Sequence, residues 1–423
     1  MAFESISVIG LGYIGLPTAA AIAARRKKVI GVDVNQMAVD TINAGDIHIV
    51  EPELDIVVNA AVSQGYLTAT TTPQAADAYL IAVPTPFKEN HQPDLSYIQK
   101  ACESIAPVLK KGDLVILEST SPVGATEQTA IWLAEARTDL TFPHQKGELS
   151  DIRVAHCPER VLPGRVMREL VQNDRIIGGM TPACSKLAAE LYHIFVDGEC
   201  ILTNARTAEM CKLTENAFRD VNIAFANELS IICDKQNINV WELIQLANRH
   251  PRVNILQPGP GVGGHCIAVD PWFIISQSPD EARLIKSARD VNDGKPKWVL
   301  DKVKIAIAEF LSKNPDRTAA SLNLACFGLA FKADIDDLRE SPALDITLEL
   351  ADMHPGTVLA VEPNIHTLPK KLEGKNVDLT SMDVALTKAD IMLVLVDHKP
   401  FKFISANKMT EKIVIDTRGI WAN

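Results

Sequence analysis

Residues 6–33 read ISVIGLGYIGLPTAAAIAARRKKVIGVD, and this stretch decides the fold of the first part of the chain. An apolar run leads into a Gly-x-Gly-x-x-Gly turn at residues 10–15, a helical pattern follows to about Arg26, and a second apolar run leads to Asp33. A strand, a glycine turn at the mouth of a helix and an acid about twenty residues further on predict a dinucleotide-binding βαβ unit.

Each part of this unit has a physical task. Gly10 makes the tight turn, Gly12 lets the backbone approach a pyrophosphate, and Gly15 lets the helix pack close to the sheet. The helix N-terminus stabilises the phosphates, while Asp33 accepts hydrogen bonds from ribose hydroxyls and repels a 2′-phosphate, which favours NAD over NADP. The alternative is a glycine turn that binds nothing. The predicted cofactor contacts here are Gly10, Gly12, Tyr13, Ile14, Gly15 and Asp33.

Further buried strands are predicted at 79–84 and 114–119, because continuous β-branched runs alternate with helical patterns. Three threonines follow these strands: Thr85 in VPTP, and Thr120 and Thr126 in ESTSPVGAT. Their hydroxyls suit nicotinamide or ribose at the same edge of the sheet, although a single threonine is more often just a turn residue. We therefore add all three to the predicted cofactor contacts.

The same layout returns late in the chain. Apolar runs at 322–332, 358–363, 391–398 and 412–419 predict a second set of strands. The first of them again ends in a glycine turn, and the second ends in an acid, Glu362, where the first unit has Asp33. The predicted fold class is therefore α/β, with two doubly wound Rossmann-like domains joined by a central helical region.

The central region contains a long predicted helix. Residues 205–236 include neither proline nor glycine, and such a helix is about 45 Å long at 1.5 Å per residue. Its apolar residues share one face. This face either supplies a dimer interface or is buried within one chain as a strut between domains, and the pattern alone does not choose between them. The residues of the face are Ala208, Cys211, Phe218, Phe225, Leu229 and Ile232.

Composition limits the classes of function. The formal net charge of −11 disfavours nucleic-acid binding, which needs a basic face. No apolar run is long enough for a membrane span, and the N-terminus does not read as a signal peptide, so we expect no membrane association and a cytoplasmic location. The eight cysteines form no CxxC pair, so neither a disulfide framework nor a metal site is predicted, and most should be small buried hydrophobes.

One cysteine stands in a different context. The segment 257–271 reads QPGPGVGGHCIAVDP, and its glycines and prolines predict a loop with Cys266 at its end, four residues before Asp270. A lone cysteine is usually a core residue, but a thiol in such a loop can be exposed and activated by neighbouring cations or backbone donors. We therefore predict that Cys266 is a reactive nucleophile.

Three clusters of cations could bind an anionic substrate against the overall charge. Lys212, Asn216 and Arg219 lie at i, i+4 and i+7 on one face of the long helix, although spacing alone fits a solvated face better. Two further clusters lie on predicted proline-containing loops. CPERVLPGR at 157–165 supplies Glu159, Arg160 and Arg165, and NRHPR at 248–252 supplies Arg249, His250 and Arg252.

Together these motifs resemble the UDP-glucose and UDP-N-acetylhexosamine 6-dehydrogenase family. The matching pieces are GLGYIG, VPTP, STSP, CPER, Lys212-x-x-x-Asn216, GGHC with Asp270 four residues after the cysteine, and FGLAFK with DDLRESP. The resemblance implies a homodimer with three parts: an NAD-binding domain at 1–200, a central dimerisation region with the catalytic loop at 201–310, and a UDP-binding domain at 311–423. It also implies a four-electron oxidation of the C6 alcohol of a UDP-sugar, with two NAD per turnover and no metal.

The resemblance also implies residue roles. Cys266 would be the nucleophile that forms a thiohemiacetal and then a thioester, and Lys212 would donate or accept the proton. Asn216 and Asp270 would position the sugar and polarise water, and Glu159 would be the base for the final hydrolysis. Arg339 would contact NAD. The implied substrate contacts are Arg160, Val161, Lys212, Asn216, Arg219, His250, Arg252, Gly263, Phe331, Lys332 and Arg418, with His250 and Arg252 reaching a partner subunit.

Two departures bear on the sugar. Members that act on UDP-glucose carry a lysine where this chain has Val269, and they lack a histidine at the position of His265. HCIAVDPWF, preceded by PGPGVGG, is more similar to the branch that oxidises UDP-N-acetyl-D-mannosamine for surface polysaccharides such as enterobacterial common antigen. UDP-N-acetylglucosamine and UDP-glucose remain alternative substrates. A one-step alcohol dehydrogenase of the 3-hydroxyacid type and an NAD-binding regulatory protein without turnover are the rival functions.

Overall fold

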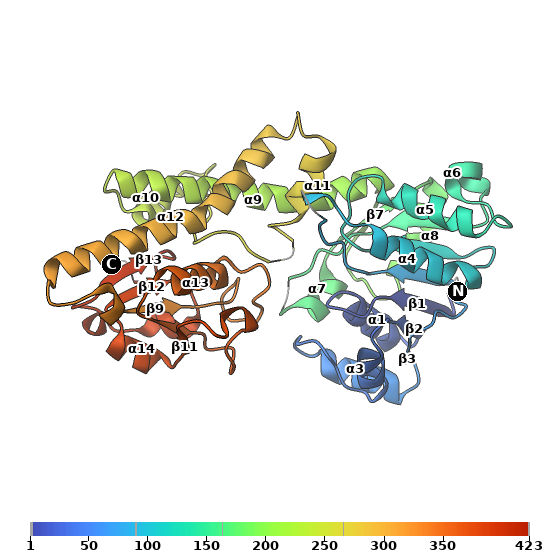
Figure 1. Cartoon of the computed structure of the whole chain (residues 1–423). Coiled ribbons are helices and arrows are strands. Elements are labelled where there is room, and N and C mark those ends of the chain that lie inside the picture. Colours follow the sequence, from blue (N-terminus) through green and yellow to red (C-terminus); the bar gives the residue numbers. More distant parts are fainter. Residues whose placement is uncertain (1–2, 89–90, 163, 265, 422–423) are drawn as a thin grey trace. The chain divides into compact units, whose positions relative to one another are not determined.

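The computed structural model describes residues 3–88, 91–162, 164–264 and 266–421. The chain divides into two compact units, Met1–Glu215 and Asn216–Asn423, each built on its own sheet (Figure 1). The boundary between the units falls inside the long helix α9, Ala205–Lys235.

The first unit has a sheet with the strand order β3-β2-β1-β4-β5-β6-β7-β8 among the described residues. Its neighbouring strands are parallel except for β6 and β7, which pair antiparallel. The order 3-2-1-4-5-6 is that of a doubly wound dinucleotide-binding fold, as predicted. The strands are β1 Ser5–Ile9, β2 Lys28–Val32, β3 Leu67–Thr70, β4 Ala78–Ile81, β5 Leu114–Leu117, β6 Arg153–His156, β7 Arg175–Gly179 and β8 Cys200–Asn204.

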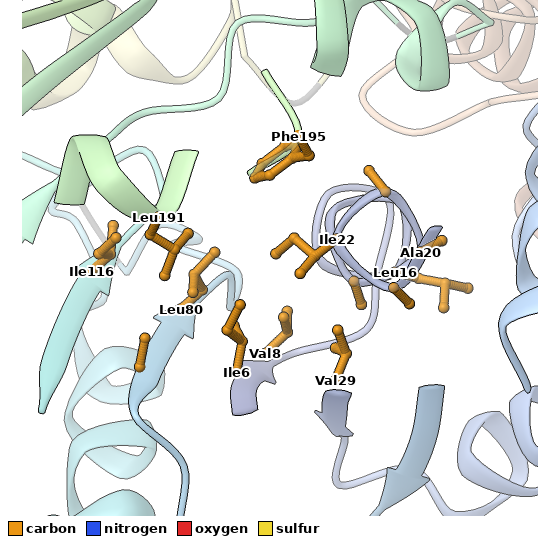
Figure 2. Close-up of a cluster of buried hydrophobic side chains, with 14 of the residues drawn as sticks. Ile6, Val8, Leu16, Ala20, Ile22, Val29, Leu80, Ile116, Leu191 and Phe195 are labelled. Atoms are coloured by element: carbon orange, nitrogen blue, oxygen red, sulfur yellow. The ribbon is translucent and has the colours of Figure 1, made fainter. Parts of the chain in front are cut away.

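Helices cover both faces of this sheet. One face packs against α1, α3 and α8, and the other against α4 and α5. Figure 2 shows the first face, where Ile22 of α1 and Leu191 near the end of α8 meet the strand residues Val8 and Leu80. The helices of this unit are α1 Gly15–Ala24, α2 Gln36–Asn43, α3 Leu54–Ser63, α4 Ser96–Ile105, α5 Ala125–Ala136, α6 Pro143–Lys146, α7 Val166–Gln172 and α8 Pro182–Tyr192.

The register of the strands aligns their carboxyl ends. Ile9 pairs with Ile81, Ile81 with Leu117, and Leu117 with His156. The residues that follow these strands therefore lie along one edge of the sheet, which is where doubly wound proteins bind their ligands.

The second unit has a parallel sheet of order β11-β10-β9-β12-β13 among its described residues, which repeats the order 3-2-1-4-5. Its strands are β9 Asn323–Phe327, β10 Thr357–Val361, β11 Val377–Leu379, β12 Ile391–Val394 and β13 Ile413–Asp416. The helices α12 (Arg283–Lys313) and α13 (Pro342–Met353) pack on one face and α14 (Met382–Lys388) on the other. The prediction of two doubly wound domains is confirmed.

The remaining helices of the second unit are α10 Val240–Ala247, α11 Asp270–Gln277, α12 Arg283–Lys313, α13 Pro342–Met353 and α14 Met382–Lys388. The predicted long helix is observed as α9, within one residue of the expected bounds. A second helix of the same length, α12, was not predicted, because Gly294 and Pro296 lie inside it and both disfavour helix.

The apolar face predicted on α9 is only partly buried. Ala208 is fully buried, whereas Phe218 is 68% exposed, Phe225 is 52% exposed and Ile232 is 42% exposed. The alternative in which this face is buried within one chain, as a strut between domains, is therefore wrong from Phe218 onward. That part of the face leaves large apolar side chains at the surface.

Candidate active site

The first glycine turn has the geometry that a dinucleotide needs. Gly10 has φ +91°, and a Cβ there would lie 2.8 Å from the carbonyl oxygen of Ala82. A Cβ on Gly15 would lie 1.8 Å from the carbonyl oxygen of Gly10, so the turn closes only with glycine at both positions. No atom lies within 4 Å of a Cβ built on Gly12, so the space in front of that residue is open to a ligand.

Asp33 follows β2 at the same edge. Its carboxylate accepts hydrogen bonds from the backbone N–H of Leu11 at 2.9 Å and of Asn35 at 2.9 Å. These bonds fix the carboxylate of Asp33 beside the glycine turn, and the residue remains half-exposed. Tyr13 is exposed and Ile14 is half-exposed within the turn. The residues present therefore fit an adenosine ribose and a pyrophosphate.

The three threonines have different environments. Thr85 donates its hydroxyl to the carbonyl oxygen of Thr120 at 2.5 Å, and both residues are half-buried. Thr126 is fully buried, and its hydroxyl and N–H both donate to one oxygen of Glu209, at 2.6 and 2.7 Å. The other oxygen of Glu209 accepts from the N–H of Gly124 at 2.7 Å. Thr126 thus fastens the start of α5 to α9, and its predicted contact with the cofactor stays a prediction.

The CPER segment follows β6. Glu159 forms a buried ion pair with Arg175 of β7 at 2.7 Å, and its other oxygen accepts from the N–H of Arg160 at 2.6 Å. The guanidinium of Arg160 is held by Glu215 of α9 at 2.7 Å, while Val161 is half-buried. The sequence did not reveal Arg175 as the partner of Glu159, because sixteen residues separate them.

Asn216 and Asp270 form a buried pair in the second unit. The side-chain amide of Asn216 donates to the carboxylate of Asp270 at 2.5 Å, and the two residues are 7% and 3% exposed. Lys212 lies one turn before Asn216 and is half-buried, whereas Arg219 is exposed. The predicted face of α9 therefore contributes an amide to the interior and a guanidinium to solvent.

Cys266 lies in the turn that leads into α11. Its carbonyl oxygen accepts hydrogen bonds from the N–H of Val269 at 3.1 Å and of Asp270 at 2.8 Å. Cys266 is exposed, whereas the other cysteines are buried or half-buried. The sequence predicted that most cysteines would be buried and that Cys266 would stand in a different environment. Burial raises the thiol pKa of Cys102 to about 12 and that of Cys326 to about 12, which makes them poor nucleophiles. His265 lies outside the described residues.

The glycine-rich segment before Cys266 packs against the carboxyl edge of the second sheet. A Cβ on Gly263 would lie 2.3 Å from the carbonyl oxygen of Glu340, and one on Gly264 would lie 2.8 Å from the ring of Phe331. A Cβ on Gly259 would lie 2.6 Å from the guanidinium of Arg418. Glycine is therefore required at positions 263 and 264, and the segment, Phe331 and Arg418 share one region of the second unit.

A buried polar network that the sequence analysis missed holds this segment to α9. The side-chain oxygen of Asn227 accepts from the N–H of Gly259 at 2.8 Å, and its amide donates to Asn292 of α12 at 2.8 Å. Asn292 and Arg289 of α12 both donate to Asp220, at 2.8 and 2.6 Å. A signal was available: Glu209, Asn216, Asp220 and Asn227 recur on one face of α9, and all four are buried.

Of the other predicted contacts, Arg418 is half-buried and the rest are exposed. Both Nε and Nη2 of Arg418 donate to Asp397 (3.0 and 2.7 Å), and this cation lowers the carboxyl pKa of Asp397 despite its burial. Arg339 forms a two-pronged pair with Asp337, with the nearest atoms 2.6 Å apart. Lys332, His250 and Arg252 are exposed.

The acid at the end of β10 differs from Asp33. Glu362 is buried and accepts from the N–H groups of Leu329 and Ala330, in the glycine turn after β9. It also lies 2.9 Å from Nε2 of the buried His398, and the hydrogen bonds and charge of its partners lower its carboxyl pKa. Glu362 therefore uses its carboxylate to stabilise the glycine turn of the second sheet.

Two further features of the described residues bear on other classes of site. No group of three histidine, cysteine, aspartate or glutamate residues in the described part of the chain is arranged to hold a metal ion. Within the same residues, no helix combines the length and apolarity needed to cross a membrane.

Comparisons with known proteins agree with this geometry. Models of the UDP-glucose/GDP-mannose dehydrogenase family match the chain in three parts: the NAD binding domain at residues 4–196, the central domain at 206–294 and the UDP binding domain at 325–423. UDP-N-acetyl-D-mannosamine dehydrogenase of Yersinia pestis is 68% identical over 421 residues and 100% of both chains. NDP-N-acetyl-D-galactosaminuronic acid dehydrogenase of Ralstonia nicotianae is 66% identical over 420 residues, 99% of this chain and 97% of that one.

A solved structure extends the likeness to three dimensions. The UDP-D-ManNAc dehydrogenase of Pyrococcus horikoshii has a TM-score of 0.86 at 39% identity, covering 98% of this chain and 96% of that one. The family expected from the sequence motifs is thereby confirmed. The chain belongs to the UDP-glucose/GDP-mannose dehydrogenase family and is an NAD-dependent oxidoreductase that takes a UDP-sugar as its substrate.

Proposed function

We propose that this protein oxidises the C6 alcohol of UDP-N-acetyl-D-mannosamine to the carboxylate of UDP-N-acetyl-D-mannosaminuronate. The observation that carries the proposal is the 68% identity, over both whole chains, to an enzyme named for this sugar. The product would enter surface polysaccharides such as enterobacterial common antigen, and the enzyme would work in the cytoplasm.

A second substrate class has specific support. A relative named for N-acetyl-D-galactosaminuronic acid is 66% identical over nearly the same length, so identity alone separates the two sugars weakly. The two candidate sugars share the 2-acetamido group and differ in configuration at C2 and C4. UDP-N-acetylglucosamine and UDP-glucose are the remaining alternatives, and all four sugars belong in the same assay.

The proposed reaction removes four electrons from C6. NAD, when bound, accepts a hydride in each of two steps, and the overall balance is RCH₂OH + 2 NAD⁺ + H₂O → RCOO⁻ + 2 NADH + 3 H⁺. A free aldehyde has no second hydride to give until a nucleophile adds to its carbon. The exposed thiol of Cys266 suits that task, because a thiolate adds readily to a carbonyl and leaves readily from an acyl group.

In the first half-reaction Lys212, or a water held by Asp270, takes the proton of the C6 hydroxyl. The sulfur of Cys266 then adds to the aldehyde carbon, which gives a thiohemiacetal, and loss of the second hydride gives a thioester. Water activated by Glu159 or Asp270 breaks the carbon–sulfur bond and releases the carboxylate. The ammonium of Lys212 stabilises the oxyanion at each tetrahedral stage.

The contacts of the described residues support two of these assignments. Asn216 holds the carboxylate of Asp270 beside the turn that carries Cys266, so that carboxylate is oriented before the sugar arrives. Arg175 and the N–H of Arg160 hold Glu159 in one geometry. We propose that the remaining predicted residues make the cofactor and substrate contacts that the family resemblance implies. We also propose that the domain boundaries lie near residues 200 and 310.

We also propose a homodimer through α9. Phe218, Phe225 and Ile232 are exposed at seven-residue intervals on one face of this helix, and exposed apolar patches of this kind mark interaction surfaces. A Phe225→Glu variant should run as a monomer in light scattering. A Glu190→Lys variant, which changes an exposed charge on α8 instead, should remain a dimer, and monomeric wild-type protein would contradict the proposal.

The deciding experiment measures NADH formed per UDP-sugar consumed, for the wild-type protein, Cys266→Ser and Cys200→Ser. Two NADH per UDP-N-acetyl-D-mannosamine are expected for wild type and for Cys200→Ser, whose half-buried thiol lies in β8. Cys266→Ser should stop at or before the aldehyde. One NADH per sugar with Cys266→Ser unimpaired would refute the covalent mechanism. No NADH with this sugar but two with another would overturn the choice of substrate alone.

A further inference from the structure

A second buried carboxyl group lies behind the CPER segment in the first unit. Glu118 directly follows β5 and is 2% exposed. The hydroxyl of Tyr192, at the end of α8, donates to one carboxyl oxygen of Glu118 at 2.6 Å. The other oxygen, Oε2, is buried and has no hydrogen-bond partner among the described residues.

Glu118 belongs to the same electrostatic cluster as the Glu159–Arg175 ion pair. The guanidinium of Arg175 lies 5.6 Å from the ring centre of Tyr192, and it pairs with Glu159 at 2.7 Å. All four residues are less than a tenth exposed. The cluster thus contains two carboxyl groups and one cation, and full ionisation would leave one uncompensated negative charge in the interior, which is costly.

Among the described residues, Arg175 is the cation whose charge acts on Glu118. Strand alternation puts Cys157 on the face of Glu118 and His156 on the opposite face, and burial raises the thiol pKa of Cys157. The helix α1, packed on the same face, contains no titratable residue. A proton is therefore the remaining means of balancing the cluster. Burial and the charge of Glu159 raise the pKa of Glu118 to about 7.

We propose that Glu118 and Glu159 form a buried carboxyl pair around Arg175 in which Glu118 carries the balancing proton, and that Glu118 is thereby a positioning residue for the hydrolysis step. The inference rests on the proposed role of Glu159 in hydrolysis. While Glu118 is protonated, the charge of Arg175 acts on Glu159 alone. When Glu118 ionises, its negative charge competes for Arg175 and weakens the hold of Arg175 on the carboxylate of Glu159.

The pair itself is tested by titration in the full-length protein. Infrared difference spectra should show a buried protonated carboxyl whose band is lost on raising the pH through about 7. Glu118→Gln should remove this step. Tyr192→Phe should move it upward by about one pH unit, because the lost hydrogen bond stabilises the ionised form. Tyr79→Phe is the matched control, since the buried hydroxyl of Tyr79 bonds backbone groups on the other face of the sheet, and it should leave the step in place.

The effect on catalysis is tested by the pH profile of product release in single turnovers after the second hydride transfer. Wild type should show an inflection near the same pH, Tyr192→Phe should shift it in parallel, and Glu118→Gln should abolish it. An inflection that stays in place in both variants, or no protonated carboxyl in the spectra, would overturn the inference. If Glu159→Gln leaves hydrolysis intact while the wild-type spectra show the expected carboxyl titration, the proposed role of Glu159 in hydrolysis is wrong. The carboxyl pair would then still be supported.

Discussion

Replacing Asn216 by aspartate would put a second carboxylate against Asp270. The present amide–carboxylate contact is 2.5 Å and both residues are buried. Two unit charges at this distance repel by about 7 kcal/mol at an effective dielectric constant of about 20. That energy corresponds to roughly five pKa units, so the variant pair should retain one proton up to about pH 9.

The consequence for stability has a definite sign. The folded variant binds a proton that the unfolded chain has lost above about pH 4, so its stability falls as the pH rises through the folded pKa. Relative to wild type, the unfolding free energy should fall by about 1.4 kcal/mol per pH unit between about pH 4 and pH 9, or roughly 7 kcal/mol in total. Urea denaturation at a series of pH values measures this slope.

The swapped double variant, Asn216→Asp with Asp270→Asn, is the control. It restores one amide and one carboxylate, so the additional slope should disappear. Turnover should not return, because the proposed mechanism needs the carboxylate at position 270. A single Asn216→Asp variant whose slope equals that of wild type would show that the two side chains do not share a buried contact and would refute the reasoning.

Burial lowers the pKa of Lys295 from 10.5 to about 7, so the unfolded chain binds the extra proton between these values and stability rises with pH there. Lys295→Met should flatten that rise, which reaches about 1.4 kcal/mol per pH unit, and an unchanged slope in chemical denaturation would contradict it. Gly15→Ala should abolish NAD binding in calorimetry, because its Cβ meets the oxygen of Gly10, while Gly12→Ala should fold normally and bind NAD more weakly; equal binding by both variants would count against this geometry. Glu209→Gln should lower the melting temperature without changing the NAD dissociation constant, because its carboxylate fastens α5 to α9; weaker NAD binding at unchanged stability would instead place it in the cofactor site.

The fold was predictable because its signals are local in sequence. The glycine turns at Gly10 and Gly328 and the continuous apolar strands give the two doubly wound sheets, and the absence of helix breakers gives α9. Helix α12 was missed, since its tertiary contacts override the weak helix propensity of Gly294 and Pro296.

The candidate site was predictable only in its residue types. Cys266, Asp270 and Glu159 were identified from motifs, and an exposed thiol at Cys266 is what the loop composition indicated. Their partners were not identified, because Asn216 is 54 residues from Asp270 and the pairing depends on the tertiary fold. Thr126 shows the same limit: the sequence did not reveal that its hydroxyl bonds a glutamate 83 residues away.

Glu362 bears on how one chain keeps two similar folds from competing for the same molecule. The equivalent acid in the first fold, Asp33, is half-exposed beside an open turn, whereas Glu362 is sealed against His398 and two amides of its own turn. A ribose hydroxyl would find no vacant acceptor there. Two folds of the same order would otherwise offer two equal dinucleotide sites, and this burial makes them unequal, so NAD should saturate the protein at one molecule per chain.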